Sequence, residues 1–534
     1  MQSLTMPNIT LPTSWNIRAV DAGVLIASVS VFYILLRRVS RRRSTALKGP
    51  SSSNFLFGAM PSIMKALDSG AIYEKWAATY GSVFAIPTIL GRKTVILSDP
   101  KAIQHLFSRD AYGYVQRPPA KRFTERLIGR GLFWAEGDSH KRQRRALNPA
   151  FSPESIKNLT PIFFDSAYKA KAAWEALLES SPSDGAIIEV QQWMNHVSLD
   201  TIGLAGFSHD FGTLSGRPSA VATAFDSLGS KPSLFDMVIF MALPILPFLI
   251  NVPTGRRMLL DRLSATMREL ADTFLAANRD VTVDKSVIGL LAKSASTERI
   301  TEEEVASQIS ALLLAGYETT AISLTWALIE LSRNPVIQTK LRDEILQTRG
   351  DPSWDELTNS LPFLDAFTCE ILRVHPPLFE AQRMASEDDI LPLSAPLETA
   401  GGAFVDSIFL RKGTMVSIPI KCINRSVEFW GADAKVFNPA RWLNPSADPH
   451  RAQEINGYRH LLTFSDGARI CIGKGFAIAE LKAVLSVLIR NFTFELPKGP
   501  DTVIGQHRNI LPRPKVDGEE GYAVPLQVRH YVAQ

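Results

Sequence analysis

The sequence predicts a mainly helical protein with a minor β component, an α+β fold, and three observations support this prediction. Most of the 534 residues have helical periodicity. Strand-like runs occur in residues 81–99 and again in residues 402–420. Within the long helical stretch at residues 301–334, residues 305–329 contain a single charge, which is typical of a helix that crosses the core of a large domain. We expect one large domain, residues 55–534, because no later repeat or low-complexity tract marks a second boundary.

Composition excludes several classes of protein. The formal net charge is +5, and the basic residues are not gathered into one long stripe, so no nucleic-acid partner is expected. The three cysteines, Cys369, Cys422 and Cys471, include no C-x-x-C pair. They therefore argue against a disulfide framework and against a zinc site.

The N-terminal region predicts a membrane anchor. Residues 22–36 are apolar and uncharged, and with residues 19–21 they approach the length that crosses a bilayer, although Asp21 interrupts the run. The basic run RRVSRRR, residues 37–43, follows the apolar stretch, whereas a cleaved signal peptide carries its positive charge before it. The basic run is also better explained as the stop-transfer flank of a membrane segment than as a nuclear localisation signal.

The positive-inside rule then gives the topology. We expect a short lumenal segment at residues 1–18, a single transmembrane signal-anchor at residues 19–36 and a basic linker at residues 37–54. The catalytic domain would face the cytosol from the endoplasmic reticulum membrane. The sequon at Asn8 would be lumenal and open to glycosylation, which would make the protein a glycoprotein.

The long apolar stretch is predicted to be one buried helix. Thr301 and Glu304 form a capping box, and Pro335 ends the helix, so about 32 residues would span about 50 Å. Its many serine and threonine residues favour the core of the protein over lipid. Glu318 is the only charge between Glu304 and Glu330. A lone acid in such surroundings is costly, so it is expected to be neutralised or functional.

A second apolar stretch, MVIFMALPILPFLI at residues 237–250, is too short and too rich in proline for a membrane span. Two interpretations remain open for it. It is either core, or an apolar roof that dips into the membrane surface.

Cys471 lies in the stretch FSDGARICIG, residues 464–473, just before a segment with helical periodicity. A free cysteine is most often a buried hydrophobe. At a helix N-terminus, however, backbone N–H groups and the dipole favour the thiolate. Gly467 and Gly473 permit close approach of a flat ligand, and Phe464 and Arg469 add an aromatic wall and a positive charge. A single thiolate without partner ligands suits haem iron better than zinc.

The pattern F-x-x-G-x-R-x-C-x-G resembles the haem-binding loop of the cytochrome P450 monooxygenases. Four further segments resemble motifs of that family and occur in the family's order: HKRQRRALNPAF at residues 140–151, AGYETT at 315–320, EILR at 370–373 and PARW at 439–442. The resemblance extends over essentially the whole chain, in a style similar to membrane-anchored fungal members.

The resemblance implies a role for each matching residue. Cys471 would be the axial ligand of the iron in haem b, while Thr319 and Glu318 would act in catalysis by hydrogen bonding to oxygen and by relaying protons. Gly316 would loosen the helix and leave a groove for dioxygen. The remaining expected haem contacts are Arg469, His140, Arg144, Arg383, Phe464, Ala315 and Gly473. The other cations beside His140, namely Lys141, Arg142 and Arg145, could face an acidic electron donor.

Glu370 and Arg373 allow two interpretations. Residues three apart meet on any helix surface, where such pairs contribute only a few tenths of a kcal/mol. With Arg441 they resemble instead the buried Glu–Arg–Arg cluster of the family. That cluster would be structural.

The expected function is that of a monomeric, membrane-anchored haem-thiolate monooxygenase. It would insert one oxygen atom of O₂ into a small apolar substrate, with electrons from NADPH through a partner reductase. Phe379 and residues 237–250 are candidate pocket walls, and the resemblance to fungal members suggests a terpenoid or another secondary metabolite. One alternative is a haem-thiolate isomerase or dehydratase that needs neither O₂ nor reductase, although the acid–threonine pair argues against it. The other is a non-enzymatic haem sensor or electron carrier, for which an apolar pocket would have no use.

Overall fold

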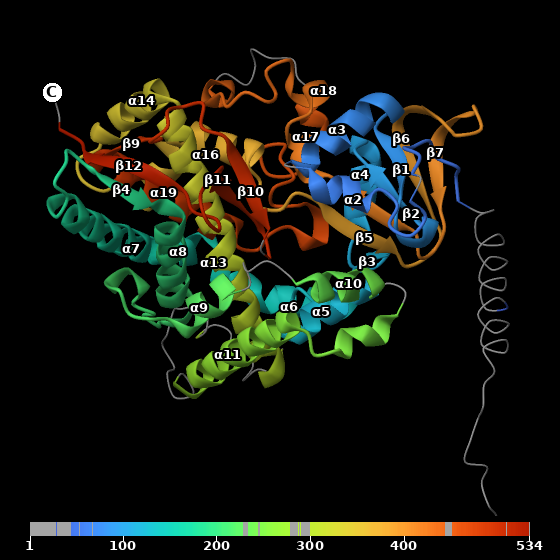
Figure 1. Ribbon diagram of the computed structural model, residues 1–534, viewed down its shortest axis with the longest axis horizontal. Coiled ribbons are helices and arrows are strands. Elements are labelled where there is room, and N and C mark those ends of the chain that lie inside the picture. The colour runs from blue at the N-terminus through green and yellow to red at the C-terminus, as the bar shows by residue number, and fades with distance from the viewer. Residues whose placement is uncertain are drawn as a thin grey trace, which may run out of the picture.

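The computed structural model describes residues 44–52, 54–66, 68–227, 233–243, 246–277, 300–443, 451–508 and 510–532, together with Ser28, Val287 and Gly289. Helices fill most of the molecule, and the sheet formed by the N-terminal strands lies at one end of it (Figure 1). The fold is therefore mostly helical with a minor sheet component, as the sequence predicts. The predicted lumenal segment, the membrane anchor and the sequon at Asn8 lie outside the described residues.

The helices carry the interior of the protein. Each α-helix of the described residues has the following bounds: α2 Met60–Lys65, α3 Ser69–Tyr80, α4 Pro100–Ser108, α5 Pro118–Ile128, α6 Gly137–Leu147, α7 Pro153–Glu179, α8 Val190–Phe207, α9 Ala220–Ser227, α10 Leu234–Ala242, α11 Gly255–Ala277, α13 Glu302–Arg333, α14 Pro335–Leu346, α15 Trp354–Asn359, α16 Pro362–Val374, α17 Ile420–Asn424, α18 Val427–Trp430 and α19 Lys474–Asn491.

The strands form four small sheets. A five-stranded sheet has the order β1-β2-β8-β5-β3, with β2 and β8 parallel, and the other sheets are β4-β12-β9, β6-β7 and β10-β11. Both predicted strand regions are confirmed, as β1–β2 and as β7–β8. The bounds are β1 Val83–Pro87, β2 Lys93–Leu97, β3 Tyr114–Val115, β4 Ala186–Glu189, β5 Ala381–Ala385, β6 Asp389–Glu398, β7 Phe404–Leu410, β8 Met415–Ile418, β9 Phe492–Glu495, β10 Ile504–Arg508, β11 Pro512–Val516 and β12 Pro525–His530.

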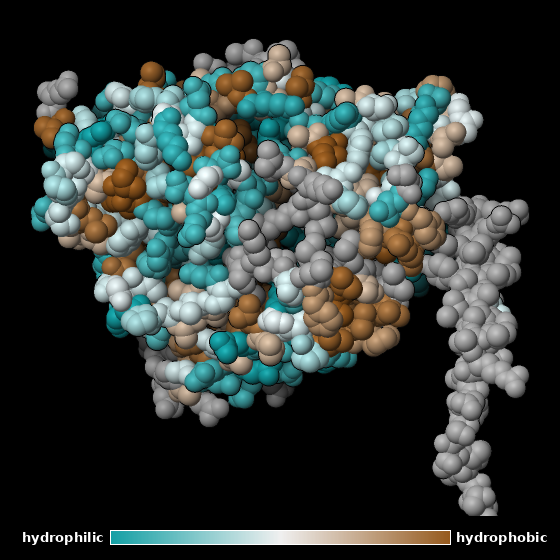
Figure 2. Space-filling view, in the orientation of Figure 1, coloured by the Kyte–Doolittle hydropathy of each residue, from teal (hydrophilic) through white to brown (hydrophobic). Residues whose placement is uncertain are grey.

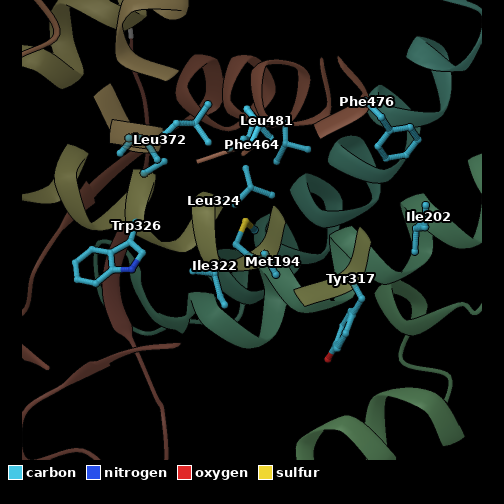
Figure 3. Close-up of a cluster of buried hydrophobic side chains, with 14 of the residues drawn as sticks. Met194, Ile202, Tyr317, Ile322, Leu324, Trp326, Leu372, Phe464, Phe476 and Leu481 are labelled. Atoms are coloured by element: carbon cyan, nitrogen blue, oxygen red, sulfur yellow. The ribbon is translucent and has the colours of Figure 1, made fainter. Parts of the chain in front are cut away.

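Helix α13 is the central element of the core. The capping box of Thr301 and Glu304 is present, and the helix runs for 32 residues, as the sequence predicts. Among the described residues it is the one helix that is long and apolar enough to cross a membrane, yet most of it is buried inside the protein. Figure 3 shows its apolar side chains packed with those of α8, α16 and α19. The helix therefore belongs to the core, not to a membrane.

Part of the predicted linker is packed against the domain. Thr45 N donates a hydrogen bond to Phe409 O (3.0 Å), and Ala85 N donates to Lys48 O (2.9 Å). Leu47 is buried. Residues 44–49 therefore belong to the folded domain, which starts earlier than the predicted boundary at residue 55.

Each described side chain of the apolar stretch at residues 237–250 is at least partly exposed, so the described part of the stretch lies at the surface. It contributes to α10 and to the 3₁₀ helix Pro247–Asn251. Apolar side chains gather over this part of the surface (Figure 2). The exposed large apolar residues of α10, the 3₁₀ helix and the start of α11 are Phe235, Val238, Leu246, Phe248 and Met258. Of the two interpretations left open by the sequence, the surface roof fits these exposures.

Candidate active site

Cys471 lies two residues before Gly473, the N-cap of α19, so its predicted position at a helix N-terminus is confirmed. Its backbone N–H donates a hydrogen bond to Phe464 O at 2.8 Å. Gly467 has a φ of +67°, and a Cβ there would lie 2.3 Å from Phe107 O. The glycine is therefore required because the loop packs against the backbone of α4. The sequence predicted that Gly467 permits a tight loop, which the positive φ confirms, and close approach of a flat ligand, which stays a prediction.

The side chain of Cys471 is exposed, whereas Cys369 and Cys422 are buried. Protein still surrounds the sulfur on most sides, and this burial raises the pKa of the Cys471 thiol. The Gly473 N–H and the charges of Arg144 and Lys474 oppose the rise without cancelling it. The Gly473 N–H at the helix N-terminus thus favours the thiolate, as the sequence predicts, while burial acts in the opposite direction. A bound metal cation supplies the charge that deprotonates such a thiol.

One short section of α13 is accessible although the helix around it is buried. The section consists of Leu314, Ala315, Gly316 and Thr319, which lie on neighbouring turns. Open space must therefore adjoin this side of the helix. The Thr319 hydroxyl donates a hydrogen bond to Ala315 O at 2.6 Å, a local bond typical of threonine within helices.

Gly316 has a different role from the predicted one. A Cβ at this position would lie 2.8 Å from Ile202 Cγ1 of α8. Glycine is needed here because α8 and α13 pack closely. The structure explains this glycine by the close contact with α8. The predicted loosening of the helix for dioxygen stays a prediction.

Glu318 is fully buried, and its Oε1 accepts from Arg513 Nε of β11 at 3.1 Å. The sequence predicts that this acid is either neutralised or functional. The ion pair with Arg513 neutralises it. Arg513 was missed, because 195 residues separate the two partners and no sequence pattern joins them.

The four basic residues predicted to contact haem lie in one neighbourhood. His140 is buried on α6, and the charges that act on it are those of Arg469, Arg144, Asp110 and Arg383. Burial, followed by Arg469 and Arg144, lowers the His140 pKa to about 4, so this imidazole is neutral at pH 7. We call His140, Arg144, Arg383 and Arg469 the cationic group.

Two acids of the chain pair with this group. Arg383 donates to both oxygens of Asp110, at 2.8 and 2.9 Å. Arg469 pairs with Glu136, and its Nε lies 3.5 Å from Asp110 Oδ1 without a hydrogen-bond partner. With three arginines against two carboxylates, the group retains one positive charge. Sequence reasoning missed Asp110 and Glu136, for which no motif gave a signal.

The remaining predicted haem contacts are local parts of the loop and its neighbours. Arg144 donates to Ile470 O, next to Cys471, and to Asn148 Oδ1 at 3.0 Å. Phe464 is buried and packs edge to face on Tyr458. The ring of Phe379, a predicted pocket wall, lies under Lys421 Nζ at 4.6 Å.

Glu370 and Arg373 form the buried cluster, not a surface pair. Neither side chain is exposed, and Arg373 Nε and Nη2 donate to the Glu370 carboxylate at 2.8 Å each. Glu370 also accepts from Arg441 Nε (3.2 Å) and Trp442 Nε1 (2.9 Å). Arg441 thus joins the pair as predicted.

A second buried acid, Glu480 of α19, was missed. It is fully buried, and its carboxylate makes no hydrogen bond among the described residues. The hydroxyls nearest to it are those of Thr320, Thr201 and Ser198, and burial without a cation raises its pKa far above the usual range. The signal was available, since Glu480 is an acid within a nearly apolar helix, as Glu318 is.

Comparison with known proteins agrees with this site. Residues 48–517 match the family model for cytochrome P450. The chain is 54% identical over 509 residues to cytochrome P450 monooxygenase claP of Ampulloclitocybe clavipes, covering 92% of this chain and 94% of that one. It is 52% identical over 526 residues to claU of the same organism, with coverage of 96% and 97%.

A more distant relative, cytochrome P450 monooxygenase 205 of Postia placenta, is 32% identical over 540 residues, with coverage of 96% and 98%. The family match at residues 48–517 includes the Cys471 loop, α13 and the Glu370 cluster. The chain belongs to the cytochrome P450 family and is a haem-iron monooxygenase.

Proposed function

We propose that this monooxygenase binds haem b through the Cys471 sulfur and oxidises a small apolar substrate with O₂ and electrons from NADPH, delivered by a partner reductase. One observation carries the proposal. The Cys471 sulfur is accessible at the N-terminus of α19, while the other two cysteines of the chain are buried.

The described residues fit haem in their donor chemistry. A haem carries two propionates, and the cationic group offers three arginines beside the Cys471 loop. Arg469 Nε has no hydrogen-bond partner among the described residues, although the atom is buried, and such groups normally have one. Arg144, Arg383 and Arg469 would hold the propionates in charge-assisted hydrogen bonds.

The chain's own residues would control water and protons. Haem supplies the oxidising chemistry when bound, with the sulfur pushing electron density toward the iron. The Thr319 hydroxyl lies on the accessible section of α13. There it can hydrogen-bond to a polar atom of a bound molecule as well as to Ala315 O. Glu318, the residue before Thr319 on α13, would supply protons.

The accessible section of α13 is the part of the described chain that bears on the substrate. Leu314, Ala315 and Gly316 give the accessible section of α13 an apolar surface. The names of the relatives state an activity and no substrate. By resemblance to fungal members of the family, we propose a terpenoid or another secondary metabolite as the substrate class.

We also propose a single-pass anchor in the endoplasmic reticulum membrane at residues 19–36, with the domain in the cytosol. Exposed apolar side chains around α10 support contact of the domain with lipid. These include Phe235 and Phe248, each more than half exposed.

The test starts from the thiolate ligand. Carbon monoxide added to the reduced holoprotein should give the red-shifted Soret band of a thiolate-bound haem. Cys471→Ala should lose this band, whereas the matched variant Cys422→Ala should keep it. A wild-type protein without the band, or a Cys471→Ala variant that keeps it, contradicts the proposal.

The reaction is tested separately. Apolar compounds should be screened for a low-to-high spin shift, and each compound that shifts the spectrum should then be incubated with reductase. Product that requires both NADPH and O₂ supports the monooxygenase. Product formed without either one indicates the isomerase or dehydratase instead.

A further inference from the structure

The acid of α13 is held by residues from two distant parts of the chain. Arg513 of β11 donates its Nε to Glu318 Oε1 at 3.1 Å, and neither side chain is exposed. The backbone N–H of Leu511 also donates to the Glu318 carboxylate. Glu318 therefore points into the β10–β11 hairpin, whereas residue 319 is about 100° further round the helix.

The contacts continue from Arg513 toward the surface. Arg513 Nη1 lies 3.4 Å from Asp226 Oδ1 of α9, and the Tyr522 hydroxyl donates to the same oxygen at 2.7 Å. The guanidinium also lies over the Tyr522 ring, at 4.6 Å. The Asp226 side chain is 36% exposed. Three side chains thus connect a fully buried carboxylate of α13 with the solvent.

The interior of this chain of contacts holds polar atoms without partners. Glu318 Oε2, Arg513 Nη2 and the Tyr317 hydroxyl are buried, and none makes a hydrogen bond within the described residues. Nearly all buried polar atoms in proteins are satisfied, often by ordered water that makes about three hydrogen bonds. These three atoms therefore indicate a place for water beside the second oxygen of Glu318.

Charge explains why Arg513 matters to Glu318. Burial raises the pKa of Glu318, and the adjacent Arg513 opposes this rise. The other titratable groups that face the pair are Asp226, Tyr522 and Tyr317. Asp226 competes with Glu318 for Arg513, because one guanidinium contacts both carboxylates.

We propose that Arg513 is a positioning residue that keeps the Glu318 carboxylate ionised and directed toward the hairpin, and that Asp226 and Tyr522 form the solvent end of the proton path to Glu318. This inference rests on the proposed function. Each proton that Glu318 passes inward is replaced by one from bulk water that enters at Asp226. The charge of Glu318 is then the same before and after, and no electron moves along this path.

The first test measures the charge of Glu318 without turnover. In Arg513→Met holoprotein, an infrared carbonyl band of a protonated carboxyl group should appear that the wild type lacks. The band should be absent from the double variant Arg513→Met/Glu318→Gln and from Arg513→Lys, which restores a cation. Persistence of the wild-type spectrum in Arg513→Met overturns the assignment of Arg513.

The second test measures proton delivery. With reductase and O₂, Asp226→Asn and Tyr522→Phe should slow NADPH oxidation and increase its solvent deuterium isotope effect, while the carbon monoxide band stays intact. Arg513→Met should reduce the rate by about 10²-fold, the lower end of what general acid catalysis contributes. Arg513→Lys should recover most of it.

Tyr168→Phe is the matched control, since the Tyr168 hydroxyl donates to Asp351 at 2.6 Å on an exposed face and touches no part of this path. If Arg513→Met fails to fold, Asp226→Asn and Tyr522→Phe still test the proton path, because both variants leave the Glu318–Arg513 pair in place. Wild-type rates and isotope effects in both surface variants overturn the inference. Loss of the carbon monoxide band from the wild type itself would instead overturn the proposed function.

Discussion

Replacing Glu370 with glutamine should destabilise the fold more than any surface change does. Glu370 and Arg373 are both fully buried, and Arg441 is 5% exposed. The variant Glu370→Gln keeps the size of the side chain but leaves two buried guanidinium groups without their shared charge. Breaking a buried pair in this way costs about 3 to 5 kcal/mol.

This cost is large compared with the total stability of a domain, which is typically about 5 to 15 kcal/mol. It corresponds to a rise of roughly 150-fold to several thousand-fold in the ratio of unfolded to folded protein. Urea unfolding followed by tryptophan fluorescence measures it as a lower midpoint. A drop in midpoint without a change in slope shows a true loss of stability.

Glu454→Gln provides the control. Glu454 pairs with Arg451 at 2.8 Å, but the two side chains are 42% and 46% exposed. Such a pair contributes about 0 to 1 kcal/mol, so this variant should unfold almost as the wild type does. If Glu370→Gln loses less than about 1 kcal/mol, like its control, the assignment of the cluster as a structural element of the core is refuted.

Three further changes test other parts of the structure. Gly316→Ala should lower the thermal midpoint, costing about 1 to 3 kcal/mol, because the new Cβ would lie 2.8 Å from Ile202 Cγ1 and 3.0 Å from Ile202 Cδ1. Ile202→Val removes Cδ1 and should restore part of the loss, whereas an unchanged midpoint in Gly316→Ala would contradict the close α8–α13 contact. Because the His140 pKa falls from 6.5 to about 4 on folding, the haem-free protein should lose stability as the pH drops from 6.5 toward 4, and His140→Gln should remove that part of the slope, measured by urea unfolding at several pH values. Burial raises the Glu480 pKa, so the free energy of unfolding of Glu480→Gln should lie within about 1 kcal/mol of the wild-type value at pH 7. The variant should also lack one infrared band of a protonated carboxyl group. A large loss of stability would show that Glu480 is ionised.

Local patterns made much of the fold predictable. The helix α13 follows from its capping box and from the single charge between Glu304 and Glu330, and both are visible in sequence. The Cys471 loop follows from five fixed positions in ten, and its resemblance to a family motif is confirmed by the family model and the relatives. These features depend on residues that are neighbours along the chain.

Features that depend on distant contacts could not be predicted. The partner of Glu318 lies on β11. Arg383 pairs with Asp110, and Arg469 pairs with Glu136. For Cys471, the sequence predicted the helix terminus that favours a thiolate but not the burial that raises the pKa of the thiol. A sequence shows the terminus but not how much protein surrounds the sulfur.

Glu304, the capping residue of α13, also affects one of the predicted docking cations. Its carboxylate accepts from Thr301 N, from both terminal nitrogens of Arg142 and from Gln143 Nε2. Arg142, one of the predicted docking cations, is therefore also the clamp that joins α6 to the start of α13. An acidic partner that binds Arg142 must therefore share this cation with the carboxylate that caps α13.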